Sequence, residues 1–187
     1  MRLGICKLPL AGACISALLL TGACHNARVP AGGGGDSLQT FLHQQVDKLP
    51  STALTLYTTH NGRTDSTNIT GDSVKAMTAA FRSDLSNLSD ASLYKESSFP
   101  DSSNHRTVIS YQALSDSTAL NMADIYIDPD TRVIRKAYLQ YVVSEGDSSI
   151  RKQLIWEADK KFTLITTVDK NEYTADMLQQ KVTWSKP

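Results

Sequence analysis

The side chains best suited to chemistry in this chain of 187 residues are its histidines and its acidic turn segments. No two of His25, His43, His60 and His105 have the i, i+2 or i, i+4 spacing that places both on one face of a strand or helix. Asp128-Pro129-Asp130 lacks the glycine and the distal glutamate of a calcium loop, and a type I turn explains it better. We therefore expect solvated histidines, no metal site and no cofactor.

A second motif, Gly35-Asp36-Ser37-Leu38, resembles the nucleophile block of GDSL-type hydrolases. That family needs a downstream Asp-x-x-His, whereas Asp101 and His105 are one residue too far apart. Gly-Asp-Ser recurs at Gly71-Asp72-Ser73 and Gly146-Asp147-Ser148, at predicted helix starts and in a turn, which indicates capping and turn chemistry. We expect no catalytic residues and a protein that is not an enzyme; a site assembled from distant loops stays an alternative.

The N-terminal segment has the pattern of a secretory signal. Arg2 and Lys7 precede an apolar stretch that runs from Leu8 to Leu20 and ends in small residues before Cys24. The stretch is shorter than the ~20 apolar residues that span a bilayer. We therefore predict export rather than a transmembrane helix.

The sequence Leu20-Thr21-Gly22-Ala23-Cys24 resembles the lipobox of bacterial lipoproteins, although that family usually has leucine where this chain has Thr21. The resemblance implies cleavage after residue 23, acylation (palmitate or a similar chain) of Cys24, and a lipid anchor in the cell envelope, in the outer membrane by our prediction. Residues 24–35, which end in four glycines, would then be the lipidated cysteine and a flexible tether. An ordinary cleaved signal and an uncleaved anchor are the alternatives.

Residues 36–187 have the length of one ordinary domain. Without Arg2 and Lys7, the chain keeps 17 basic and 19 acidic side chains with no basic cluster, so we expect no nucleic-acid partner. Cys6 and Cys14 would leave with the signal, and Cys24 would be the only cysteine of the mature chain, which excludes disulfides and cysteine-zinc sites.

Apolar residues at helical spacing predict two amphipathic helices, at about 37–49 and 73–88, each starting at an aspartate, Asp36 or Asp72, as N-cap. Asn61-Gly62 between β-prone runs predicts a hairpin of Leu54–His60 and Arg63–Ile69. Turn residues every 8–12 positions then separate seven further runs: 93–97, 107–114, 120–127, 133–143, 150–156, 162–168 and 173–184. The predicted fold is α+β: a curved antiparallel meander of about 7–9 strands with both helices on one face.

This order of elements, with Asn61-Gly62-Arg63, a helix reading 81–87 and antiparallel strands ending in the run Lys161 to Ile165, resembles small uncharacterised envelope lipoproteins of Bacteroidota-type bacteria. The resemblance implies location and fold but no activity. Exported proteins of that group can carry O-glycans on Asp-Ser/Thr sites. The candidate sites here are Ser37, Ser66, Ser73 and Ser117.

From the sequence alone we therefore expect a membrane-tethered envelope lipoprotein whose domain binds a ligand or supports an assembly. The alternatives are a periplasmic or surface protein that binds lipid, glycan or peptide, and an enzyme with a site not visible in the sequence. The expected partners are the membrane, through the lipid, and an envelope protein or a small apolar ligand.

Overall fold

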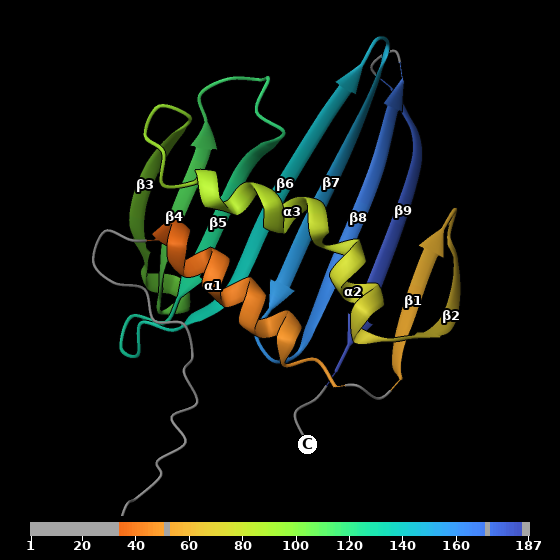
Figure 1. The fold of residues 1–187 in the computed structure, drawn as a ribbon, viewed down its shortest axis with the longest axis horizontal. Helices are drawn as coiled ribbons and strands as arrows, with labels where there is room; N and C mark the ends of the chain where they lie inside the picture. Colours follow the sequence, from red (N-terminus) through yellow and green to blue (C-terminus); the bar gives the residue numbers. More distant parts are fainter. Residues whose placement is uncertain (1–33, 51–52, 171–172, 185–187) are drawn as a thin grey trace, which may run out of the picture.

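The computed structural model describes residues 34–50, 53–170 and 173–184. In this part of the chain nine strands form one antiparallel sheet in the order β2-β1-β9-β8-β7-β6-β5-β4-β3, which does not close into a barrel. The helices lie together on one face of that sheet (Figure 1). The predicted α+β class and the antiparallel meander are confirmed.

The strands are β1 Leu54–His60, β2 Arg63–Ile69, β3 Tyr94–Asp101, β4 Arg106–Ala113, β5 Leu120–Ile127, β6 Ile134–Glu145, β7 Ser148–Glu157, β8 Lys161–Lys170 and β9 Tyr173–Thr183. From β3 to β9 each strand pairs with the next along the chain. The N-terminal hairpin adds to the far side of this meander, because β1 pairs with β9. The first and last strands of the chain are therefore neighbours.

The hairpin of β1 and β2 has the geometry that its sequence predicts. Asn61 and Gly62 both have positive φ, 49° and 76°, as a two-residue type I′ turn requires. The register runs without a shift from His60 opposite Arg63 to Leu54 opposite Ile69.

The strand at the opposite edge, β3, continues through Pro100, where we predicted a break. An edge strand tolerates this proline because its missing N–H need not have a partner.

The first helix, α1 Gly34–Asp47, begins two residues before the predicted cap. Gly34 and Gly35 are buried in its first turn, so the predicted tether 24–35 overlaps the helix. Both glycines are needed by packing: a Cβ on Gly34 would overlap the Tyr111 hydroxyl, and one on Gly35 would lie 3.1 Å from Leu88 Cβ. The predicted signal segment and the rest of the tether, residues 1–33, lie outside the described residues.

The prediction of one continuous helix at about 73–88 is wrong. It is divided into α2 Gly71–Met77, α3 Ala79–Asp84 and the short 3₁₀ helix η1 Leu85–Asn87; a further 3₁₀ turn, η2 Ser102–Asn104, joins β3 and β4. The break falls at Thr78, which is buried and whose hydroxyl donates to the Val74 carbonyl oxygen at 2.9 Å. The backbone N–H of Thr78 donates to the same oxygen at 3.1 Å, and the backbone leaves helical geometry at this residue, with φ −102° and ψ 1°. The predicted caps are also wrong: α2 has Thr70 as N-cap, and Asp72 lies in its first turn.

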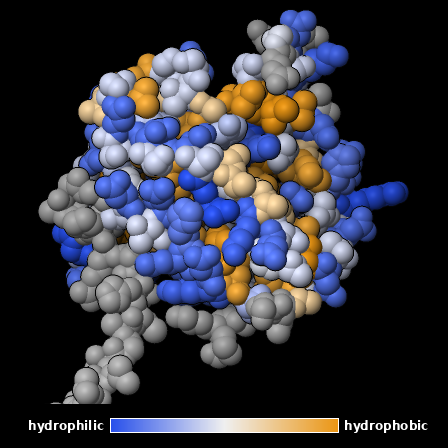
Figure 2. Space-filling view, in the orientation of Figure 1, coloured by the Kyte–Doolittle hydropathy of each residue, from blue (hydrophilic) through white to orange (hydrophobic). Residues whose placement is uncertain are grey.

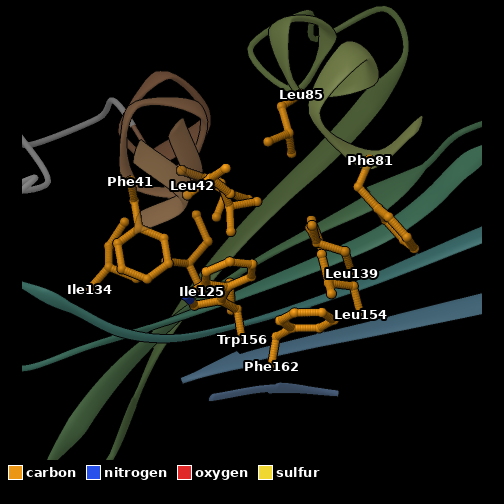
Figure 3. Packing of buried hydrophobic residues seen from close by; sticks show 14 of the residues in the cluster. Phe41, Leu42, Phe81, Leu85, Ile125, Ile134, Leu139, Leu154, Trp156 and Phe162 are labelled. Carbon is orange, nitrogen blue, oxygen red and sulfur yellow. The ribbon is translucent and has the colours of Figure 1, made fainter. Parts of the chain in front are cut away.

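One core fills the space between the helices and the sheet (Figure 3). Phe41 and Leu42 of α1 and Phe81 of α3 contact a sheet surface made by alternate residues of β5 to β8, including Leu139 and Trp156. Trp156 stacks on Phe162 with ring centroids 5.4 Å apart, and Phe81 meets Tyr141 edge-on at 5.9 Å. Successive residues of β6 face opposite sides of the sheet, since Leu139 is buried while Tyr138 faces away from the helices.

Gln45 joins α1 to the sheet through polar contacts inside this core. Its Oε1 accepts hydrogen bonds from Trp156 Nε1 at 3.3 Å and from the Asp159 backbone N–H at 2.8 Å. Its Nε2 donates to Asp159 Oδ1 at 3.3 Å. A glutamine that is 6% exposed thus provides hydrogen-bond partners both for the indole and for the turn between β7 and β8.

Candidate functional site

The face of the sheet opposite the helices, which we call the open face, is not covered by any described element. Successive side chains of a strand point to opposite faces, and the register carries this alternation from strand to strand. Leu154 and Trp156 are buried under the helices, whereas their neighbours Gln153 and Ile155 point to the open face. Its main side chains are those of Tyr57, Phe99, Arg106, Asp124, Tyr126, Lys136, Tyr138, Gln140, Gln153, Ile155, Thr163, Ile165, Gln179 and Lys181.

Tyr126 of β5 lies between two cations on this face. The Arg106 guanidinium carbon is 4.6 Å from the ring centroid and the Lys136 ammonium nitrogen is 5.5 Å from it. Arg106 also donates through Nε to Asp101 Oδ2 at 2.7 Å. Burial, with a smaller contribution from Asp124, raises the pKa of Tyr126, so the phenol stays neutral and is a hydrogen-bond donor.

A hydrogen-bonded group of three side chains lies beside this tyrosine, on β6 and β7. Gln153 Nε2 donates to the Tyr138 hydroxyl at 2.9 Å and to Gln140 Oε1 at 3.1 Å. The Tyr138 hydroxyl donates to the same Gln140 oxygen at 3.0 Å. These contacts fix both amides and one phenol in a single arrangement, with remaining donors and acceptors available to a ligand.

A shallow hollow of about 300 Å³ lies further along the open face, over β2, β1 and β9. Tyr57, Thr59, Thr64, Gln179 and Lys181 line it. The Tyr57 side chain is 44% exposed, and the hydroxyls of Thr59 and Thr64 are 2.8 Å apart across the hairpin. The open face therefore presents tyrosine rings near both ends of its width.

The balance of free charge on the open face is positive. Lys95, Lys136 and Lys181 have no carboxylate within 4.0 Å among the described residues, whereas Asp124 is a carboxylate without an ion pair in the same part of the chain. The remaining basic side chains of the face are paired at 2.7–3.1 Å: Arg106 with Asp101, Arg151 with Asp169, and Lys161 with Glu157. Rings, fixed amides and unpaired ammonium groups together suit a polar, extended, anionic ligand.

The predicted histidines are not brought together. His43 is exposed on α1, His60 lies 2.6 Å from Asp176 Oδ1, and His105 lies 2.9 Å from Asp130 Oδ2. Within the described residues no group of three or more histidine, cysteine, aspartate or glutamate side chains could hold a metal ion. His25 lies outside the described residues.

Asp128 organises the turn between β5 and β6, where we weighed a calcium loop against a turn. Its Oδ1 accepts from the backbone N–H groups of Asp130 at 3.2 Å and Thr131 at 2.9 Å, and its Oδ2 accepts from Arg135 at 2.9 Å. The Thr131 backbone bond and then the Arg135 bond hold the pKa of Asp128 well below its usual value. These carboxylate oxygens are therefore used inside the turn.

This pKa shift predicts an acid dependence of stability. Because the folded pKa lies below the unfolded value near 3.8, the stabilisation is present above pH 3.8 and is lost as the pH falls through the folded pKa. We expect Asp128→Asn to flatten the fall in Tm between about pH 5 and pH 2. Thermal melts of both proteins across this range measure it, with Asp116→Asn in an exposed turn as the control. Parallel curves for Asp128→Asn and the wild type would contradict the assignment.

The three Gly-Asp-Ser copies lie in the first turn of α1, in the first turn of α2 and in the turn after β6. The three copies therefore lie in separate parts of the fold. Of the candidate glycosylation residues, Ser66 on β2 and Ser117 in a turn are exposed, Ser73 is half-buried, and Ser37 is only 7% exposed within α1. Modification of the folded protein would be easiest at Ser66 and Ser117, and all four sites stay predictions.

The open face was missed at the sequence level, although the signal was present. The alternation of Tyr138, Gln140 and Val142 against Leu139 and Tyr141 in β6 indicates that one side of the strand is polar and aromatic. What the sequence could not give is the register, which places Gln153 beside Gln140 and Tyr126 beside Lys136.

Cys24 lies outside the described residues, and no described helix has the length and hydropathy needed to cross a bilayer. No protein-family model, curated protein or solved structure matches this chain.

Proposed function

We propose that the protein is a lipid-anchored, non-enzymatic envelope protein that binds an acidic glycan on its open face. The observation that carries the proposal is Tyr126 between Arg106 and Lys136, next to the fixed Tyr138–Gln140–Gln153 group. Anchoring is supported by the signal-like segment and Cys24. The tether would hold the domain close to the membrane surface, where cell-envelope polysaccharides lie.

The choice of ligand follows from three properties of the open face. The exposed ring of Tyr57 offers a flat apolar surface to the C–H face of a sugar, and a hydroxyl at one end. Glutamine amides offer paired donors and acceptors to sugar hydroxyls. Lys95, Lys136 and Lys181 attract carboxylate or sulfate groups. Protein interfaces are depleted in lysine at their centres, so a protein partner fits this face less well.

Binding of oligogalacturonate, a uronic-acid oligomer, to the full chain tests the proposal by calorimetry, with a neutral oligoglucan of equal length beside it. We expect Tyr126→Ala to weaken oligogalacturonate binding about tenfold, because it removes the ring that positions Arg106 and Lys136, and the two lost cation–π contacts are worth about 1–2 kcal/mol. Lys136→Gln should weaken it severalfold, and added salt should reduce that difference.

The control variant is Lys75→Gln, which removes an exposed lysine on the helix side of the sheet. It should bind the oligomer as the wild type does. Equal affinity for the neutral oligomer, or equal losses for Lys75→Gln and Lys136→Gln, would refute an acidic-glycan site on the open face.

A second candidate function, docking to an envelope protein, is favoured by an apolar patch on the helix side. Figure 2 shows apolar residues gathered beyond α3, where the long strands pass the helices. Val143, Ile150 and Val168 are cross-strand neighbours there, and Ile150 is 39% exposed. Crosslinking in native membranes with Ile150→Asp beside the wild type tests this role: loss of one defined partner supports docking, and an unchanged partner set opposes it.

A further inference from the structure

The strand β2 leaves one edge of the sheet open. Among the described residues it pairs with β1 alone, and six of its seven residues are exposed, the exception being the half-buried Ile69. In Figure 1 it forms the last strand on one side of the sheet. A strand edge of this kind presents a row of unpaired N–H and C=O groups that can pair with another chain.

The two edges of the sheet differ in how they are protected. The opposite edge, β3, contains Pro100, which cannot donate a hydrogen bond, and the charged pair Lys95 and Glu96. Such residues are the usual means of preventing edge-to-edge pairing. The strand β2 also has two charged residues, Arg63 and Asp65, but it contains no proline, no lysine and no register shift against β1. The edge that is less protected against pairing is therefore β2.

The turn fixes which groups of β2 face outward. In a two-residue hairpin the residues flanking the turn, here His60 and Arg63, form a hydrogen-bonded pair. By alternation, Asp65, Thr67 and Ile69 also bond to β1. The N–H and C=O groups of Thr64, Ser66 and Asn68 consequently point away from the sheet.

This set of three is self-complementary. In an antiparallel pair of two β2 strands with the two-fold axis at Ser66, Ser66 lies opposite Ser66 and Thr64 lies opposite Asn68. Each of the three pairs exchanges two bonds, which gives about six backbone hydrogen bonds. Asp65 then faces Thr67, and Arg63 faces Ile69, so no like charges are directly opposite.

We propose that two copies of this chain pair through their β2 strands, in antiparallel register about Ser66. The contact is isologous, as a two-fold dimer requires, and it makes one continuous sheet from two. Both open faces then lie on the same side, with the hollows at Tyr57 and Lys181 next to the dimer axis. A single strand pair buries much less than the ~1,600 Å² of a standard interface, so the dimer is weak and depends on concentration. It does not depend on the proposed ligand.

Cysteine crosslinking of the full chain in membranes of expressing cells tests the register. In the proposed dimer the two Ser66 Cα atoms are ~5.5 Å apart, within the range that a disulfide bridges. Ser66→Cys should therefore give a covalent dimer under mild oxidation. The two Thr64 residues are separated by four residue steps, ~13 Å, so Thr64→Cys alone should not crosslink, whereas Thr64→Cys mixed with Asn68→Cys should. The wild type, run in parallel, controls for Cys6, Cys14 and Cys24.

Two proline variants distinguish a loss of dimer pairing from a loss of folding stability. Ser66→Pro removes an outward N–H and leaves the ladder to β1 intact, so the mixed Thr64→Cys and Asn68→Cys crosslink should fall at least tenfold with little change in Tm. Thr67→Pro removes an inward N–H and should lower Tm. Equal crosslinking at Ser66 and Thr64, or no crosslinking at Ser66 in a folded protein, would overturn the proposal.

Discussion

Replacement of Trp156 by alanine is expected to lower the free energy of unfolding by about 3–5 kcal/mol, the range for deleting a large buried aromatic side chain. The indole is fully buried between the helices and the sheet. It stacks on Phe162 with an interplanar angle of 13° and contacts Trp184 at 5.4 Å. The cavity left by alanine would lie at the point where α1, β7, β8 and the C-terminal end of β9 meet.

Urea unfolding followed by circular dichroism measures this change, which is a large part of the stability of a domain of this size. Tyr57→Ala is the control, because it also removes an aromatic ring but from the open face, where Tyr57 is 44% exposed. We expect it to change the free energy of unfolding by less than about 1 kcal/mol. Similar losses for both variants would show that Trp156 is not the centre of the core.

Gln45→Leu is expected to cost about 2–4 kcal/mol although leucine is more hydrophobic than glutamine. The variant removes the acceptor of Trp156 Nε1 and of the Asp159 backbone N–H, both at buried or partly buried positions. Each donor left without this acceptor costs about 1–3 kcal/mol. The two hydrogen bonds that Gln45 accepts are therefore more important for stability than the apolar area that leucine would add.

The neighbouring residue gives a matched control, since Gln44→Leu is the same substitution one position along α1 at a half-buried site. A double-mutant cycle with Trp156→Phe identifies the bond itself. Phenylalanine has no indole N–H, so Gln45→Leu should cost less in that background. A cost for Gln45→Leu that is equal in both backgrounds, or equal to that of Gln44→Leu, would rule out this role.

The fold class was accessible from the sequence because its signals are local. The turn at Asn61-Gly62 and the regular spacing of turn residues define strands within a few positions. The helix predicted at 73–88 is divided at Thr78, where φ is −102° and ψ is 1°, and a periodicity of apolar residues does not report such a local change of the backbone. The start of α1 was missed since the burial of Gly34 depends on the distant Tyr111.

The candidate site was less accessible because it is made by register rather than by a motif. Gln140 and Gln153 are 13 positions apart, and neither belongs to a recognisable pattern. Arg106 and Lys136 meet at Tyr126 from β4 and β6, through pairings that only the three-dimensional sheet defines. The histidines and Gly-Asp-Ser copies, which the sequence does show, lie apart from one another.

The pairing of β1 with β9 also sets the order in which the molecule can be completed. Thr55 is opposite Thr183, so this ladder closes a loop of more than a hundred residues, whereas the other ladders of the described residues join strands that are adjacent in the chain. Contacts between residues so far apart in the sequence form late, and they reduce the folding rate. A chain emerging from its N-terminus would present the β1–β2 hairpin first and its partner strand last. During that interval both edges of the hairpin are exposed, and a chaperone that recognises extended backbone would find its target there.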